Sequence, residues 1–190
     1  KNDFDQAKIY LSNTFNYVQQ NRFKLAILET LKQYIYVFKE KKILSSQKSF
    51  GQLSVISETF QRCYLGDQKT DEYFLNLIDN KESDFTRYTY FYLTYLIEKN
   101  RIDDVKEITD NIKFINTTLL LSQGKSWIEN NNTKKLTHFF SCKNHNDIIS
   151  EFLFLISNLY SSEDDFEQSN FYLNLSNFLK IGRASCRERV

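Results

Sequence analysis

The residues best suited to metal chemistry are His138, Cys142 and His145, which fall within eight residues of one another. Imidazole and thiolate are common zinc ligands, and zinc sites use the two-residue gap that separates Cys142 from His145. A structural zinc needs four ligands, however, and only a tertiary approach could bring Cys63 to complete this set. The incomplete set favours three ordinary side chains, so we expect no metal and no other cofactor. A metal-dependent module using these residues remains the weaker alternative.

Two short motifs resemble parts of enzyme active sites. Gly124-Lys125-Ser126 copies the end of a phosphate-binding loop, but that loop requires a glycine where this chain has Leu119, and it requires a preceding strand. The segment Ser45–Lys48 fits the Ser-x-x-Lys pattern of certain acyl-transfer enzymes without their accompanying motifs. Neither motif predicts a nucleotide site or a nucleophile.

The paired carboxylates Asp103-Asp104 and Asp164-Asp165 stand where helices are expected to begin. Acidic residues at these positions cap the helix and interact favourably with its dipole, whereas acid–base catalysis needs opposed, buried groups. The Asn-x-Ser/Thr triplets at Asn116, Asn131 and Asn174 are expected by chance in an Asn-rich chain. Nothing in residues 1–180 predicts catalysis.

The charge balance argues against two classes of partner. The formal net charge is +1, and 16% of the residues are aromatic. Aromatic side chains can stack on bases, but nucleic-acid binding also needs a basic excess to hold phosphates. We therefore expect no nucleic-acid partner. The apolar runs are also too short to predict a membrane-spanning helix.

The last ten residues, Ile181–Val190, differ from the rest of the chain. They contain three Arg and one Glu in a sequence otherwise rich in Lys, Asn, Ile, Phe and Tyr. The peptide IGRASCRERV resembles the translation of a common sequencing adapter, so we treat it as a non-native tail. Without it the net charge becomes −1. We expect the chain to be a fragment that continues beyond both ends.

Apolar residues recur at helical spacing along the whole chain, and the links between these runs are rich in Asn, Ser and Asp. Asp3 is the expected cap of the first helix, and Gly66 the expected stop after the third. The absence of Pro and the presence of only four Gly suit long helices. The prediction is an all-α chain of about ten helices. The expected ranges are 4–20, 23–40, 50–64, 70–78, 84–98, 102–112, 118–129, 133–140, 146–160 and 165–179, the last two joined by Ser161–Asp164.

The later helices form an internal repeat. When the helical pairs are aligned on their links, equivalent residues lie 31 and 33 positions apart. The first helices of the pairs align Leu93 with Gly124 and Ser157, and Leu96 with Trp127 and Tyr160. The second helices align Val105 with Leu136 and Ser169, and Thr109 with Phe140 and Leu173. A small residue midway along the first helix and another early in the second allow close helix approach.

This pattern resembles the tetratricopeptide repeat, whose period is about 34 residues. The resemblance is most specific over the last hundred residues before the tail, and Ser157, Tyr160, Phe166, Ser169 and Ser176 fit it best. It implies antiparallel hairpins stacked as an α-solenoid over residues 49–180, after an N-terminal helical pair in residues 1–48. The pieces are similar to long, divergent repeat proteins of bacteria, which implies a periplasmic or cell-envelope location.

The resemblance also implies a concave face lined by the first helix of each pair. The expected ligand groove for an extended peptide or partner helix contains Arg87, Tyr90, Thr94, Leu121, Lys125, Phe154 and Asn158. The favoured function is a non-enzymatic scaffold that binds a protein or peptide. The alternative is the helical accessory region of a larger enzyme whose catalytic domain lies outside this sequence.

Overall fold

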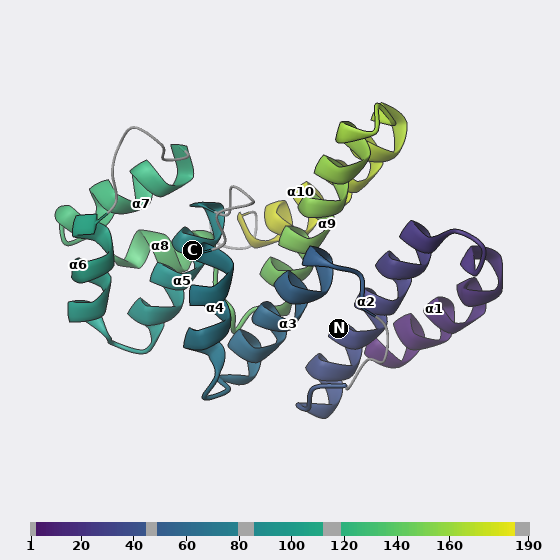
Figure 1. The fold of residues 1–190 in the computed structure, drawn as a ribbon, viewed down its shortest axis with the longest axis horizontal. Coiled ribbons are helices and arrows are strands. Elements are labelled where there is room, and N and C mark those ends of the chain that lie inside the picture. Colours follow the sequence, from purple (N-terminus) through teal and green to yellow (C-terminus); the bar gives the residue numbers. More distant parts are fainter. Residues whose placement is uncertain (1–2, 45–48, 80–85, 112–118, 185–190) are drawn as a thin grey trace. The chain divides into compact units, whose positions relative to one another are not determined.

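The chain is all-helical throughout the part that its computed structural model describes, residues 3–44, 49–79, 86–111 and 119–184 (Figure 1). Ten helices are present there, as the apolar periodicity predicts. Ser45–Lys48, the segment with the Ser-x-x-Lys pattern, lies outside the described residues. The helices divide into two compact units, residues 1–65 with 145–190 and residues 66–144.

The first unit joins the two ends of the chain. Its helices are α1 (Phe4–Val18), α2 (Arg22–Glu40), α3 (Gln52–Leu65), α9 (His145–Ser162) and α10 (Phe166–Ala184). Tyr34 of α2 is fully buried in its core, 5.8 Å from the ring of Phe38 and 5.7 Å from the ring of Phe152 on α9. Burial of such large rings is the main force that holds these helices together.

Polar side chains close the N-termini of the first two helices. The Asp3 carboxylate accepts a hydrogen bond from the Gln6 amide at 2.9 Å, which confirms the expected cap. The Asn21 side chain accepts the Lys24 amide in the same way at the start of α2. These caps satisfy backbone donors that have no partner within the helix.

Helices α9 and α10 form a tightly packed antiparallel hairpin. The Ser157 hydroxyl donates to the backbone oxygen of Ser169 at 2.9 Å, and the Ser150 hydroxyl donates to that of Ser176 at 2.9 Å. Ser176 returns a bond to the Ser150 backbone oxygen at 2.8 Å. All four serines are buried, so the small residues singled out by the repeat do permit close helix approach.

The second unit contains the middle of the chain. Its helices are α4 (Thr70–Ile78), α5 (Thr86–Glu98), α6 (Ile102–Asn111), α7 (Leu119–Glu129) and α8 (Lys134–Phe139). Helix α5 packs against the other four. Its face residues Phe91, Leu93 and Leu96 are fully buried. The aromatic run of α5 is thus core, as its helical spacing indicates.

The helix-ending links repeat with the period seen in the sequence. Gly66, Asn100, Asn131 and Asp164 all adopt the left-handed conformation, with φ of 66°, 58°, 55° and 60°. After Asn100, Asn131 and Asp164, the amide of the following residue donates a hydrogen bond to the carbonyl oxygen five residues before it in the chain. Those acceptors are Leu96, Trp127 and Tyr160, which the sequence alignment treats as equivalent. The repeat is therefore a repeat of backbone geometry as well as of residue type.

The division into units differs from the expected domain boundary at residue 48. Helix α3 packs against α2 and α9 in the first unit, and α9 also packs against α2. Residues 49–144 and 145–180 were expected to form one continuous stack.

The helix α10 runs to Ala184, and residues 185–190 of the proposed non-native tail lie outside the described part of the chain.

Candidate functional site

The expected ligand groove consists largely of packing residues. In the second unit the exposed fraction is 0% for Tyr90 and Thr94, 2% for Leu121 and 8% for Lys125. Arg87 is half-buried, with its guanidinium carbon 5.3 Å from the centre of the Phe91 ring. In the first unit Phe154 is half-buried and Asn158 is exposed. A side chain with no exposed surface cannot contact a ligand in this arrangement.

Tyr90 shows how side chains at the expected groove positions pack against other helices of the same unit. A side-chain carbon added to Gly124 of α7 would lie 2.9 Å from Cδ2 of Tyr90, closer than real contacts allow. The Tyr90 hydroxyl faces the backbone oxygen of Leu136 at 3.4 Å, and burial raises the pKa of this tyrosine. Gly124 is therefore a helix-contact residue, and its phosphate-loop resemblance has no structural counterpart.

The three candidate metal ligands occupy different surroundings. His138 is exposed on α8, Cys142 is buried after it, and His145 begins α9 in the other unit. Among the described residues, no three His, Cys, Asp or Glu side chains gather closely enough to hold a metal ion.

In the same part of the chain, none of the helices combines the length and apolar character needed to cross a bilayer.

A polar cluster links three helices of the second unit. Asp71 on α4 accepts the Tyr92 hydroxyl at 2.7 Å and a guanidinium N–H of Arg101 at 2.7 Å, and Arg101 also binds Asp104 on α6. Burial, reinforced by the bond to Asp71, raises the pKa of Tyr92. Every member has a partner, so the cluster ties α4, α5 and α6 together. The Asp103-Asp104 pair lies in the first turn of α6, as expected.

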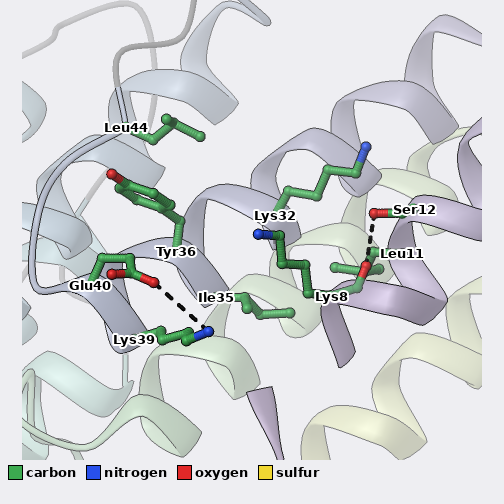
Figure 2. A pocket seen from close by; sticks show the side chains of 9 residues that line it. All are labelled: Lys8, Leu11, Ser12, Lys32, Ile35, Tyr36, Lys39, Glu40 and Leu44. Atoms are coloured by element: carbon green, nitrogen blue, oxygen red, sulfur yellow. Dashed lines mark hydrogen bonds and ion pairs between the residues drawn. The ribbon is translucent and has the colours of Figure 1, made fainter. Parts of the chain in front are cut away.

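One hollow in the first unit is a pocket of about 290 Å³ between α1 and α2, which we call the lysine pocket (Figure 2). Its apolar lining residues are Leu11 from α1, Ile35 from α2 and Leu44 beyond the end of α2. Ser12 and Tyr36 add hydroxyl groups. The charged lining residues are Lys8, Lys32, Lys39 and Glu40.

The three lysines of the pocket differ in their partners. Lys39 donates to Asp5 at 2.5 Å, and this bond lowers the pKa of the Asp5 carboxyl. The Lys32 ammonium lies 3.8 Å from Glu29 and 4.4 Å from the centre of the Phe15 ring. Lys8 makes no ion pair with any described residue. Figure 2 shows its side chain extending from α1 toward α2, so its ammonium group adds to the positive charge of the pocket.

The outer face of α10 carries an exposed apolar stripe. Phe171, Leu175 and Phe178 recur at positions i, i+4 and i+7, with exposed fractions of 54%, 38% and 74%. At about 100° per residue, Phe171 lies about 200° around the helix from Ser169, which faces α9. The stripe is therefore directed away from the hairpin partner. Exposed asparagines flank it: Asn170, Asn174 and Asn177.

Sequence reasoning did not identify the lysine pocket. Its α1 residues, Lys8 and Ser12, are separated by four positions, as are Lys32 and Tyr36 of α2. This spacing places polar residues beside the apolar stripe of each helix, where they border the α1–α2 contact. The same spacing also fits an ordinary solvated face, so only the packed hairpin reveals the hollow.

Comparison with known proteins gives no relative: no family model, curated protein or solved structure matches this chain.

Proposed function

We propose that this chain is a non-enzymatic protein-interaction scaffold built from tetratricopeptide-like helical hairpins. The observation that carries the proposal is the apolar stripe of Phe171, Leu175 and Phe178 on α10. Single exposed apolar residues are common on protein surfaces, but a contiguous apolar row on one helix face favours a binding surface.

The proposed occupant is an amphipathic helix of a protein partner. A row at i, i+4 and i+7 forms a ridge, and such ridges pack into the groove of a facing helix. Neutral amides flank the stripe along its sides and Glu167 lies one turn before it, so the centre of the partner's contact face should be apolar. The repeated left-handed links support the hairpin-repeat architecture, because they return each chain segment to the same antiparallel geometry.

A photo-crosslinking experiment tests the stripe. A benzophenone amino acid is placed at Leu175, and in a matched protein at Asn13, an exposed position on α1. We expect crosslinks to one defined protein from position 175 only. That protein is then purified and its dissociation constant measured with wild type and with Phe171→Ser/Phe178→Ser.

We expect the double substitution to weaken this binding at least 30-fold, because two large exposed rings would lose their contacts. Tyr10→Ser, which removes an exposed ring on α1, serves as the control and should leave the affinity within twofold. Equal affinity of the purified partner for wild type and the double variant would overturn the proposal, as would equal crosslinking from both positions. A bacterial envelope location would be supported if the captured protein is itself an envelope protein.

A further inference from the structure

The link between α9 and α10 carries a compact acidic and aromatic segment. Four carboxylates, those of Glu163, Asp164, Asp165 and Glu167, surround Phe166, which is 60% exposed. We call residues 163–167 the acidic tip. It lies at the turn of the α9–α10 hairpin, where the two helices meet (Figure 1). The turn thus presents one exposed apolar ring among four acidic groups.

The charges of the acidic tip are available to a partner. None of its four carboxylates makes an ion pair with a described residue. Asp165 accepts the Gln168 amide at 3.1 Å as the cap of α10, and Asp164 holds the left-handed position of the link. These bonds hold the turn in shape and leave the acidic tip with a strong negative charge around one apolar ring.

The lysine pocket has the complementary chemistry. It offers apolar lining residues and three ammonium groups, of which Lys32 is paired with Glu29 and Lys39 with Asp5 and Glu40, whereas Lys8 makes no ion pair with the described residues. A volume of about 290 Å³ is at the small end of ligand pockets, which run from about 300 to 1,000 Å³. It therefore suits one large side chain with adjoining charges.

We propose that the lysine pocket binds the acidic tip of a second copy of this chain, with Phe166 against the apolar lining residues and the carboxylates of the tip beside Lys8. Complementary charge sets the orientation and speeds the encounter, and burial of the ring supplies the apolar contact. This self-association uses a different surface from the α10 stripe, so it goes beyond the proposed function and does not rest on it.

The acidic tip does not reach the pocket of its own chain in this structure. Both belong to the first unit, where the Tyr160 ring, just before the tip, lies 5.0 Å from the ring of Phe23 at the start of α2. Ile35 in the pocket is twelve residues further along that helix, about 18 Å at 1.5 Å per residue. The pocket and the tip thus face different ends of the unit.

A contact between two different surfaces is heterologous. Each copy that fills a pocket with its tip still has its own pocket open, so copies add head to tail and form an open chain unless the arrangement closes into a ring. The association should therefore grow with protein concentration beyond the dimer, and it should weaken as salt screens the charges.

Sedimentation velocity at increasing protein concentration tests this assembly. We expect wild type to associate, Lys8→Glu to weaken the association at least tenfold, and Glu163→Lys/Phe166→Ser to do the same. Lys24→Glu is the matched control, since it makes the same charge change at an exposed position of α2 outside the pocket. Circular dichroism establishes that each variant keeps its helix content.

Mixing the two defective variants gives the sharpest readout. Lys8→Glu retains an intact tip, and Glu163→Lys/Phe166→Ser retains an intact pocket. Each should be monomeric alone, and a mixture should form one-to-one dimers that grow no further. A mixture that stays monomeric overturns the proposal when wild type associates. Loss of association in Phe171→Ser/Phe178→Ser would also overturn it, by assigning the contact to the α10 stripe.

A synthetic peptide covering Ser161–Ser169 provides a second measurement. We expect the labelled peptide to bind wild type and the Lys24→Glu control equally, and to lose at least tenfold in affinity for Lys8→Glu or when its phenylalanine is replaced by serine. Wild type that remains monomeric at all concentrations excludes a second copy as the occupant. If the peptide still binds in that case, the pocket belongs to another protein with an acidic and aromatic segment.

Discussion

At the scale of single residues, His145 stands out because its Nε2 atom is buried without a hydrogen-bond partner. The imidazole lies among rings of the first unit, 5.5 Å from Phe4 and 5.7 Å from Phe38 between ring centres. Burial, with a smaller effect from the Lys41 charge, lowers the pKa of His145. The folded chain therefore favours the neutral imidazole more strongly than the unfolded chain does.

This shift predicts a loss of stability in acid. An unfolded histidine has a pKa of about 6.5, and the folded value is lower, so the unfolded state binds more protons in between. Neutral His145 contributes to the free energy of unfolding above about pH 6.5, and this contribution is lost as the pH falls from there through the pKa of the folded state. We expect the free energy of unfolding, measured with urea, to fall from pH 7.5 to pH 5 by less in His145→Gln than in wild type.

His138→Gln is the control for removing an imidazole, because His138 is exposed on α8. Its change in stability over the same pH range gives the effect of removing an imidazole from an exposed position. If His145→Gln and wild type lose the same stability over this range, burial of His145 has no part in the acid sensitivity of the fold.

At the scale of elements, the left-handed residues of the links are the clearest repeated feature. Asn100, Asn131 and Asp164 have φ near 60°, a region in which side chains other than Gly are strained and Asn and Asp are the best tolerated. Gly66 fills the equivalent place without strain. Asn, Asp and Gly at these four links suit this geometry, whereas Lys41 at the end of α2 adopts it, with φ of 55°, as a lysine.

Glycine at a strained link should stabilise the chain. We expect Asn131→Gly to raise the free energy of unfolding by roughly 0.5–1 kcal/mol, since relief of the left-handed strain outweighs the added freedom of the unfolded chain. The measurement is urea unfolding followed by circular dichroism at 222 nm, a standard helix signal.

Asn132→Gly provides the matched control one residue later. Asn132 is exposed and lies outside the set of positive-φ residues, so glycine there adds unfolded-state freedom with no strain to relieve. It should lower stability slightly. A gain at position 132 equal to that at 131 would show that the left-handed link is not the cause.

The helices, their caps and the stop at Gly66 follow from the sequence because they depend on neighbours within one or two turns. Apolar spacing reveals which face of a helix is buried, and Asp3 signals a start through its own side chain. The positions of Ser157 and Ser169 were also predictable, since only small residues permit the hairpin contact that both helices make.

The candidate sites depended on information that local patterns do not contain. Tyr90 and Thr94 were placed on a concave face by analogy with other repeats, yet both are buried. An apolar or aromatic residue gives the same sequence pattern whether a partner or another helix of the same chain covers it. The lysine pocket combines Lys8 with Lys39 across two helices, and its hollow depends on how those helices pack.

At the scale of the whole molecule, the first unit is discontinuous in sequence. Residues 1–65 and 145–190 form one compact unit, while residues 66–144 form another. The two segments of the first unit meet through large rings, including the pairs Tyr34–Phe152 and Phe23–Tyr160 at 5.7 Å and 5.0 Å. Such contacts form only after distant parts of the chain have come together, which slows folding relative to a simple hairpin.

Because these contacts are internal to the first unit, they should form without a covalent connection. We expect separate chains of residues 1–65 and 145–184 to associate one to one and to gain helical circular dichroism beyond the sum of the two alone. Phe152→Ala, which removes a ring only 3% exposed, should weaken this association by more than a hundredfold, since a buried Phe→Ala change costs about 3–5 kcal/mol.

Leu159→Ser in the second fragment is the control, because Leu159 is 37% exposed on the same helix and should leave the affinity within about threefold. If Phe152→Ala leaves the affinity between the two fragments unchanged, α9 contacts residues 1–65 through side chains other than those packed around Tyr34. No gain of helix on mixing would mean that residues 66–144 are needed to complete the first unit. With the expected result, the ring contacts between the two ends of the chain are sufficient to assemble it.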